Sequence, residues 1–181
     1  NYHYLVPELH EGHTFTLASN RLFDEVDEAL RAGFTPKVTL TGPLTWLWLG
    51  KTKGGDFDRL TLLDSVLDVY GEILARLATQ GIEWVQLDEP ALVQDLPLAW
   101  QQAYERAFHR LQSVPLKLLL ATYFGGLGDN LSLAQYLAGR FGCLARTPAA
   151  VKSAPGSAAL VGTQLLAVAC AGGFGSGDRA W

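Results

Sequence analysis

The sequence predicts an α/β fold with a parallel sheet, in the form of a partial (β/α)8 TIM barrel. Through residues 1–137, short apolar runs typical of strands alternate with longer amphipathic runs typical of helices. About four strand–helix units follow one another, roughly half of a complete barrel, which needs ~250 residues. The competing fold is a doubly wound sheet, but no Gly-x-Gly-x-x-Gly motif follows any predicted strand.

The first predicted elements are strands at residues 3–6 and 37–42, with a helix between them at 20–32. The helix has its apolar residues on one stripe, and Gly33 supplies a stop signal. A short helix is expected from Pro43, because proline fits the first position of a helix.

A long amphipathic helix is predicted over residues 58–81, where leucines recur at spacings of three and four. Gly81 is expected to end this helix. The remaining predicted elements are a strand at 83–90, a helix at 97–112, a strand at 116–124 and a short helix at 130–137.

Composition changes near residue 137, which divides the chain into a predicted barrel segment (1–137) and an atypical tail (138–181). The first segment carries 10 basic and 17 acidic residues, a charge of 10 − 17 = −7 out of the total of −4. The tail is rich in alanine and glycine, contains both cysteines and has no amphipathic repeat. We therefore expect the tail to pack poorly and not to supply the missing strands.

Composition excludes several classes of protein. A net charge of −4 argues against a nucleic-acid surface, and no apolar run reaches the ~20 residues of a membrane span. The two cysteines, Cys143 and Cys170, have no Cys-x-x-Cys spacing and favour a reducing compartment, so we expect a cytoplasmic protein. The chain starts at Asn1 and contains no methionine, so we expect a fragment of a longer protein.

Polar or turn-forming residues follow three of the predicted strands. In a parallel barrel, the carboxyl ends of all strands open on one face, and ligands bind there. We therefore expect a substrate-binding face that is formed by Thr41, Asp88, Glu89 and Tyr123. A carboxylate there can orient a ligand or act as a base, but it can equally cap a helix or pair with a cation. Pro90 should keep Glu89 extended, because proline disfavours the helical region for the preceding residue.

Other candidate residues have simpler interpretations. Trp46 and Trp48 can stack on a flat heterocycle, but packing is the commoner role. Lys51 and Lys53 can attract an anionic ligand, but lysines in a Gly-rich loop are usually just solvated. The two histidines of HEGH (10–13) have no evident third metal ligand, so no metal site is expected.

The segments NYHYLVPEL, KVTLTGPLTWLWLGK, FDRLTLLDSVLDVYGEILARLATQGIEWVQLDEPALVQDLP and LLLATYFGGLGDNL, taken together and in order, resemble the amino-terminal half of the cobalamin-independent methionine synthase family. The resemblance runs through residues 1–137. It implies a zinc-dependent methyltransferase with two (β/α)8 barrels, which transfers a methyl group from 5-methyltetrahydrofolate polyglutamate to homocysteine without cobalamin.

The resemblance also implies that catalysis lies in the carboxy-terminal barrel, whose His, Cys, Glu and Cys zinc ligands have no counterpart here. No catalytic or metal-binding residue is therefore expected in this chain, and the isolated chain should be inactive. In the family, the carboxy-terminal barrel has a similar Asp-Glu-Pro strand end, whose Asp helps to bind homocysteine. Asp88 and Glu89 are the equivalent pair in the amino-terminal barrel, so the resemblance does not give them that role.

After Leu137 the sequence departs from the family, which continues with a strand resembling GLHVDL. Our hypothesis is that residues 138–181 come from a shifted reading frame or a sequencing error. Two alternatives to a methyltransferase fragment stay open: a non-catalytic barrel domain that binds a folate or an anionic ligand, and an unrelated barrel enzyme similar to uroporphyrinogen decarboxylase. Zinc ligands encoded downstream of this sequence would favour the methyltransferase fragment over the non-catalytic binding domain.

Overall fold

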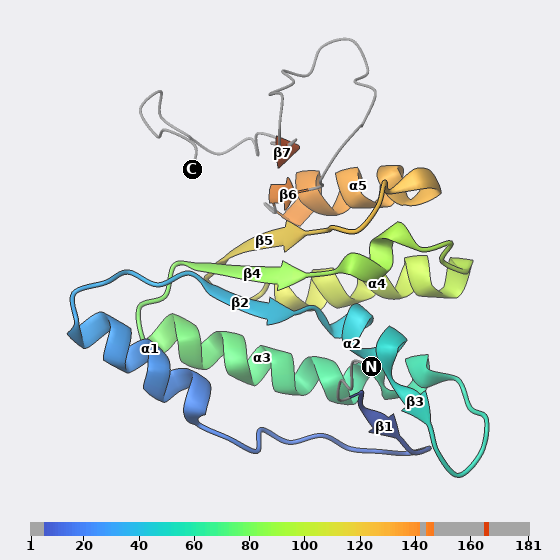
Figure 1. The fold of residues 1–181 in the computed structure, drawn as a ribbon, viewed down its shortest axis with the longest axis horizontal. Helices are drawn as coiled ribbons and strands as arrows, with labels where there is room; N and C mark the ends of the chain where they lie inside the picture. The colour runs from blue at the N-terminus through green and yellow to red at the C-terminus, as the bar shows by residue number, and fades with distance from the viewer. Residues whose placement is uncertain (1–5, 142–143, 147–164, 167–181) are drawn as a thin grey trace, which may run out of the picture.

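The computed structural model describes residues 6–141, 144–146 and 165–166. Its main sheet has the strand order β2–β4–β5–β6–β7 (Figure 1), with parallel pairing except between β6 and β7. The bounds of these strands are Val38–Thr41, Trp84–Asp88, Lys117–Ala121, Leu144–Arg146 and Leu165–Leu166. Two further short strands, β1 (Glu8–Leu9) and β3 (Lys51–Thr52), form a separate parallel pair.

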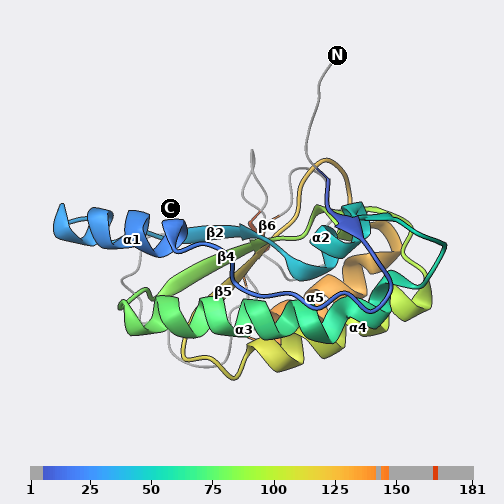
Figure 2. The ribbon, with the colours of Figure 1, turned by 90° about the horizontal axis from the view of Figure 1, so that it is seen from below.

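The helices connect the parallel strands. They are α1 (Arg21–Arg31), α2 (Pro43–Leu49), α3 (Leu63–Thr79), α4 (Leu98–Leu111) and α5 (Leu131–Phe141), with 3₁₀ turns η1 (Arg59–Leu62), η2 (Pro90–Val93) and η3 (Gly128–Asn130). Seen from below, α3, α4 and α5 run along the same side of the sheet (Figure 2). In the part of the chain that the structure describes, no helix is long and apolar enough to span a membrane.

Strand β4 shows how the sheet separates its two faces. Val85 and Leu87 are fully buried in the same core cluster as the apolar stripes of α3 and α4. Trp84, Gln86 and Asp88 alternate with them and are only partly buried. Because successive side chains of a strand point to opposite faces, the second set lies on the face away from those helices.

Most of the predicted elements are confirmed. The helix expected at 20–32 is α1, the strands expected at 37–42, 83–90 and 116–124 are β2, β4 and β5, and the helix expected at 97–112 is α4. The three strands are neighbours, as their order in the sequence predicts. The strand predicted at 3–6 lies almost entirely outside the described residues.

Several boundaries differ from the predictions: the strands expected to run to residues 90 and 124 end at Asp88 and Ala121, and two helices also have different ends. The helix expected from residue 58 begins as the 3₁₀ turn η1, because the Asp58 side chain accepts a hydrogen bond from the Leu60 amide (2.9 Å) and holds a tighter first turn. The last helix continues beyond Leu137 to Phe141.

The expectation that the tail supplies no strands is not met by its described residues. The short strands β6 and β7 extend the sheet beyond β5, with β6 parallel to β5. A strand of two or three residues is too short for an alternating pattern to be visible in the sequence. The rest of the tail, including Cys143 and Cys170, lies outside the described residues.

The described strands form an open sheet with β2 at one edge and β7 at the other. The α/β class and the parallel pairing are confirmed. Closure of this sheet into a barrel, or into part of one, stays a prediction.

Candidate functional site

The carboxyl ends of β2, β4 and β5 lie side by side. Thr41 is in register with Asp88, which is in register with Ala121. Backbone hydrogen bonds continue past the strands, from the Gly42 amide to the Asp88 carbonyl (2.7 Å) and from the Glu89 amide to the Ala121 carbonyl (2.8 Å). The turns that carry the predicted site residues are therefore held together at one edge of the sheet.

Asp88 is the centre of a polar network on the sheet face away from α3 and α4. One carboxylate oxygen accepts a hydrogen bond from Gln86 Nε2 (2.6 Å), and the other accepts one from the Tyr123 hydroxyl (3.2 Å). Lys37 Nζ donates in turn to the Gln86 side-chain oxygen. Burial, followed by the negative charge of Asp88, raises the pKa of Tyr123, which keeps its hydroxyl protonated as the donor.

Thr41 is the exposed member of this edge. Its carbonyl accepts a hydrogen bond from the Tyr70 hydroxyl of α3 (2.6 Å). Burial, with a smaller effect from the charge of Glu89, raises the pKa of Tyr70, so that tyrosine remains a donor. We define the strand-end patch as the side chains of Thr41, Asp88 and Tyr123.

Glu89 points away from the strand-end patch and is fully buried. Its Oε1 accepts a hydrogen bond from the Leu44 amide (3.1 Å), and its Oε2 accepts from the Thr45 amide (2.8 Å) and the Tyr104 hydroxyl (3.0 Å). The two amides belong to the first turn of α2. The Glu89 carboxylate therefore caps the amino-terminal end of α2.

Burial raises the pKa of Glu89 to about 7, although the hydrogen bonds from Thr45, Tyr104 and Leu44 act in the opposite direction. Burial and the charge of Glu89 also raise the pKa of Tyr104. Gly42 is required beside this carboxylate, because a Cβ at that position would lie 2.1 Å from Glu89 Oε1.

Of the four predicted site residues, the structure brings three together and separates the fourth. Glu89 was expected to be extended and to share the open face. Its backbone angles are instead φ −119° and ψ 62°, and its side chain lies on the helix side. The alternation of β4 indicated this direction, because Glu89 follows Val85 and Leu87 at a spacing of two and so points to the same face as they do. Tyr70 and Tyr104 had no such local signal.

Phe124 is a further feature of this edge that the sequence did not indicate. It follows Tyr123 and has a φ of 80°, the one positive value for a non-glycine residue among those described. The residue is 86% exposed, and its ring lies edge-on to Tyr123 with 4.6 Å between centroids. This backbone conformation costs about 1–3 kcal/mol for a residue with a side chain and is commonly found at functional positions.

The other candidates take structural roles. Trp46 packs edge-on against Phe15, and Trp48 packs edge-on against Trp100. His10 and His13 lie in a loop, with their rings 5.2 Å apart. Within residues 6–141, 144–146 and 165–166, no group of three or more His, Cys, Asp or Glu side chains is placed to hold a metal ion.

Known proteins match this chain over most of its length. The family model described as "Cobalamin-independent synthase, N-terminal domain" matches residues 1–140. The 5-methyltetrahydropteroyltriglutamate–homocysteine methyltransferase of Proteus mirabilis (strain HI4320) is 56% identical over 137 residues, which is 76% of this chain but 18% of that relative. The chain thus spans less than a fifth of the length of this curated relative.

A solved B12-independent methionine synthase from Shewanella sp. W3-18-1 has 22% sequence identity and a TM-score of 0.40, and the match covers 56% of this chain and 29% of that one. Structural similarity at this level supports no argument about the fold. The family match over residues 1–140 and the 56% identity are sufficient without it. The chain belongs to the family of cobalamin-independent synthase N-terminal domains.

Proposed function

We propose that this chain is part of a methyltransferase that makes methionine in the cytoplasm. The parent protein would transfer a methyl group from 5-methyltetrahydrofolate polyglutamate to homocysteine. The observation that carries this proposal is the 56% identity, over 137 residues, to an enzyme named for that reaction. The family description supports a reaction that does not use cobalamin.

In this proposal, methyl transfer takes place outside the chain, in a carboxy-terminal barrel that is its partner domain. The parent would use zinc, but the described residues do not fit a zinc site, because no group of three potential ligands lies together among them. We therefore assign no catalytic step to these residues. Their proposed role is to provide the partner surface and an accessory contact for substrate.

The strand-end patch is the proposed accessory contact. Asp88 accepts two hydrogen bonds from neutral side chains, and a carboxylate has about four lone-pair sites, so it can still accept from an N–H group of a ligand. Thr41 is exposed beside it, and Tyr123 supplies a hydroxyl. The proposed role of Glu89 is to hold this edge of the sheet in place through its hydrogen bonds to α2; it is not itself part of the patch.

We further propose that the sheet is part of a (β/α)8 barrel. In a doubly wound fold, helices cover both faces of the sheet, whereas in a barrel they cover the outer face. Here α3, α4 and α5 lie on one side (Figure 2). The other face of β4 carries polar side chains, among them Gln86 and Asp88, which would line the interior of the barrel.

The alternative function, a non-catalytic domain that binds folate or an anionic ligand, has less support. Of the two lysines that suggested an anion site, Lys53 is paired with Glu8 (3.0 Å). The strand-end patch itself carries the carboxylate of Asp88, which repels anions. We therefore do not favour an anion-binding role for this edge.

The test is a chimera with the Proteus mirabilis relative, in which residues 1–137 of this chain replace the matching segment. We expect the chimera to form methionine from homocysteine and the methylated folate, because the proposal assigns this segment to the same enzyme. The chain alone, with zinc and both substrates, should form none. A folded chimera without activity would contradict the proposal, as would chelator-sensitive activity of the chain alone.

A further inference from the structure

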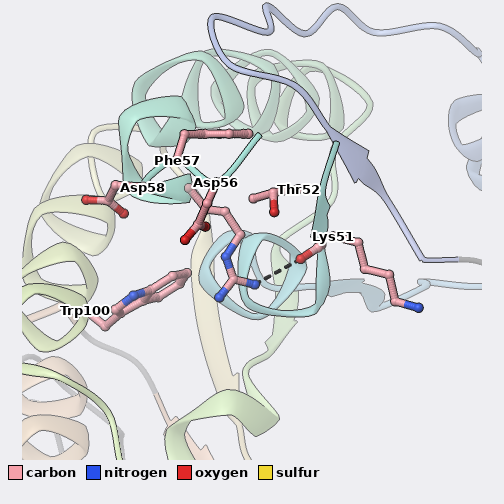
Figure 3. A pocket seen from close by; sticks show the side chains of 8 residues that line it. Lys51, Thr52, Asp56, Phe57, Asp58 and Trp100 are labelled. Atoms are coloured by element: carbon pink, nitrogen blue, oxygen red, sulfur yellow. Dashed lines mark hydrogen bonds between the residues drawn. The ribbon is translucent and has the colours of Figure 1, made fainter. Parts of the chain in front are cut away.

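A hollow of about 540 Å³ opens at the carboxyl end of α2, the end opposite Glu89. Trp100 and Phe57 provide apolar parts of its wall (Figure 3), and Arg59 also lines it. Small-molecule sites in proteins typically have volumes of about 300–1,000 Å³. The hollow shares no residue with the strand-end patch, so it is a different site from the proposed substrate contact.

The guanidinium of Arg59 is fixed in place on one side. Its Nη1 donates to the carbonyls of Leu47 (3.2 Å) and Gly50 (2.9 Å), and to that of Trp48. The group also lies 5.6 Å from the ring centroid of Trp48 and 5.4 Å from that of Trp100. These contacts orient the planar group before any ligand arrives, which lowers the entropic cost of binding.

The opposite edge of the guanidinium, Nε and Nη2, has no hydrogen-bond partner within the described part of the chain. Arg59 is one of the residues that line the hollow, together with Asp56 and Trp100. Two parallel N–H groups of arginine match the two oxygens of a carboxylate. The free edge therefore offers a bidentate site for a carboxylate.

Asp56 and Asp58 bring negative charge to the same hollow. Asp56 and Arg59 line the same hollow, yet no ion pair within 4.0 Å joins these two described residues. Asp58 uses one oxygen to cap η1. Lys51 adds no second cation, because its side chain points away from the hollow (Figure 3).

This charge arrangement selects the class of ligand. A simple anion would be attracted by Arg59 but repelled by two carboxylates and by the negative end of α2. A simple amine would be attracted by Asp56 but repelled by Arg59. A molecule with both a carboxylate and an ammonium group places each charge beside its opposite. An apolar side chain on that molecule could lie against Trp100.

We propose that this hollow binds a free α-amino acid with an apolar side chain. The carboxylate accepts two hydrogen bonds from Nε and Nη2 of Arg59, and the ammonium group donates to the carboxylate of Asp56. The apolar side chain packs against Trp100 and Phe57. This site is separate from any substrate contact at the strand ends.

The test uses the full chain and three matched probes: L-norleucine, hexanoate, which lacks its ammonium group, and pentylamine, which lacks its carboxylate. Binding is followed by tryptophan fluorescence and by the indole N–H signals in NMR spectra. We expect norleucine to shift the Trp100 signal at millimolar concentrations and to bind about tenfold more tightly than either control, since each lost charged hydrogen bond weakens binding by about that factor. Hexanoate binding as tightly as norleucine would overturn the proposal, and so would a lack of norleucine binding.

Asp56→Asn is the decisive variant, because Asp56 is exposed and no hydrogen bond or ion pair among the described residues depends on it. It should weaken norleucine binding about tenfold and leave hexanoate binding unchanged or tighter. Asp95→Asn, at another exposed aspartate outside the hollow, is the matched control and should change neither. Unchanged norleucine binding by Asp56→Asn would overturn the assignment. Arg59→Lys is a weaker test, because Arg59 also holds three carbonyls of the fold.

Discussion

Replacing Glu89 should show how strongly the strand ends depend on one buried carboxylate. Glu89→Ala removes the acceptor for three buried donors: the amides of Leu44 and Thr45 and the hydroxyl of Tyr104. Each unsatisfied donor costs about 1–3 kcal/mol, and the loss is reduced because a buried charge is also removed. We expect the free energy of unfolding to fall by about 3–5 kcal/mol at pH 7, which is less than the sum over three unsatisfied donors because the cost of burying the charge is relieved.

The same residue predicts a dependence of stability on pH. The pKa of Glu89 is raised from 4.5 in the unfolded chain to about 7 in the folded chain. A raised folded pKa means that the folded state binds the proton more tightly, so its stabilising effect is present at low pH and is lost as pH rises from 4.5 to 7. Between pH 5 and pH 8, this group alone should lower the stability by roughly 2 kcal/mol.

The assay is urea unfolding of the chain, followed by circular dichroism and tryptophan fluorescence, at several pH values from 5 to 8. Glu89→Gln keeps the shape of the side chain but cannot ionise, so its stability should lack this contribution to the pH dependence. Glu105→Gln, on the exposed side of α4, is the control and should retain the wild-type slope. If Glu89→Ala cost less than about 1 kcal/mol, or if Glu89→Gln kept the full slope, our account of this carboxylate would be refuted.

Three other measurements test the same geometry. Gly42→Ala should destabilise the chain by about 1–3 kcal/mol in urea unfolding, because its Cβ would overlap Glu89, whereas Gly71→Ala in α3 has open space and should be neutral or stabilising by up to about 1 kcal/mol. In an intact parent enzyme, Asp88→Ala should lower turnover far less than removal of a zinc ligand; an equal loss in a stably folded variant would place the active centre in this half. Amide hydrogen exchange should be slowest in β4, which is paired on both sides, and faster in the edge strand β2; the reverse order would contradict the sheet order.

The sequence predicted the elements of this fold better than the directions of its side chains. Periodicity located α1, α4 and three neighbouring strands, because the positions of helices and strands depend mainly on local patterns. The same alternation within β4 could have separated Asp88 from Glu89, since Glu89 continues the buried series of Val85 and Leu87. Taken only as an adjacent acidic pair, the two residues predict a single site.

The partners of Glu89 could not be predicted from the sequence. Leu44 and Thr45 lie 45 and 44 residues away from it, and Tyr104 lies 15 residues away on α4. No local pattern connects these positions, because their contact depends on how α2 and α4 pack against the end of β4. The positive φ of Phe124 and the free edge of Arg59 are likewise consequences of tertiary structure.

Helix α2 is contacted at its two ends by the side chains of Glu89 and Arg59, which are far apart in the sequence. A helix of seven residues leaves most of its amides and carbonyls without partners inside the helix, so it is not stable by itself. Glu89 binds the free amides at its first turn, and Arg59 binds the free carbonyls at its last turn. Each charged form is opposite in sign to the helix end that it contacts, which favours the helix, although for Glu89 the cost of burying the charge is larger, as its raised pKa shows. Because the turn after β2 leads directly into α2, fixing this helix also fixes Gly42 and the edge that carries Thr41. The strand-end patch and the hollow beside Trp100 therefore depend on one short helix held by opposite charges at its two ends.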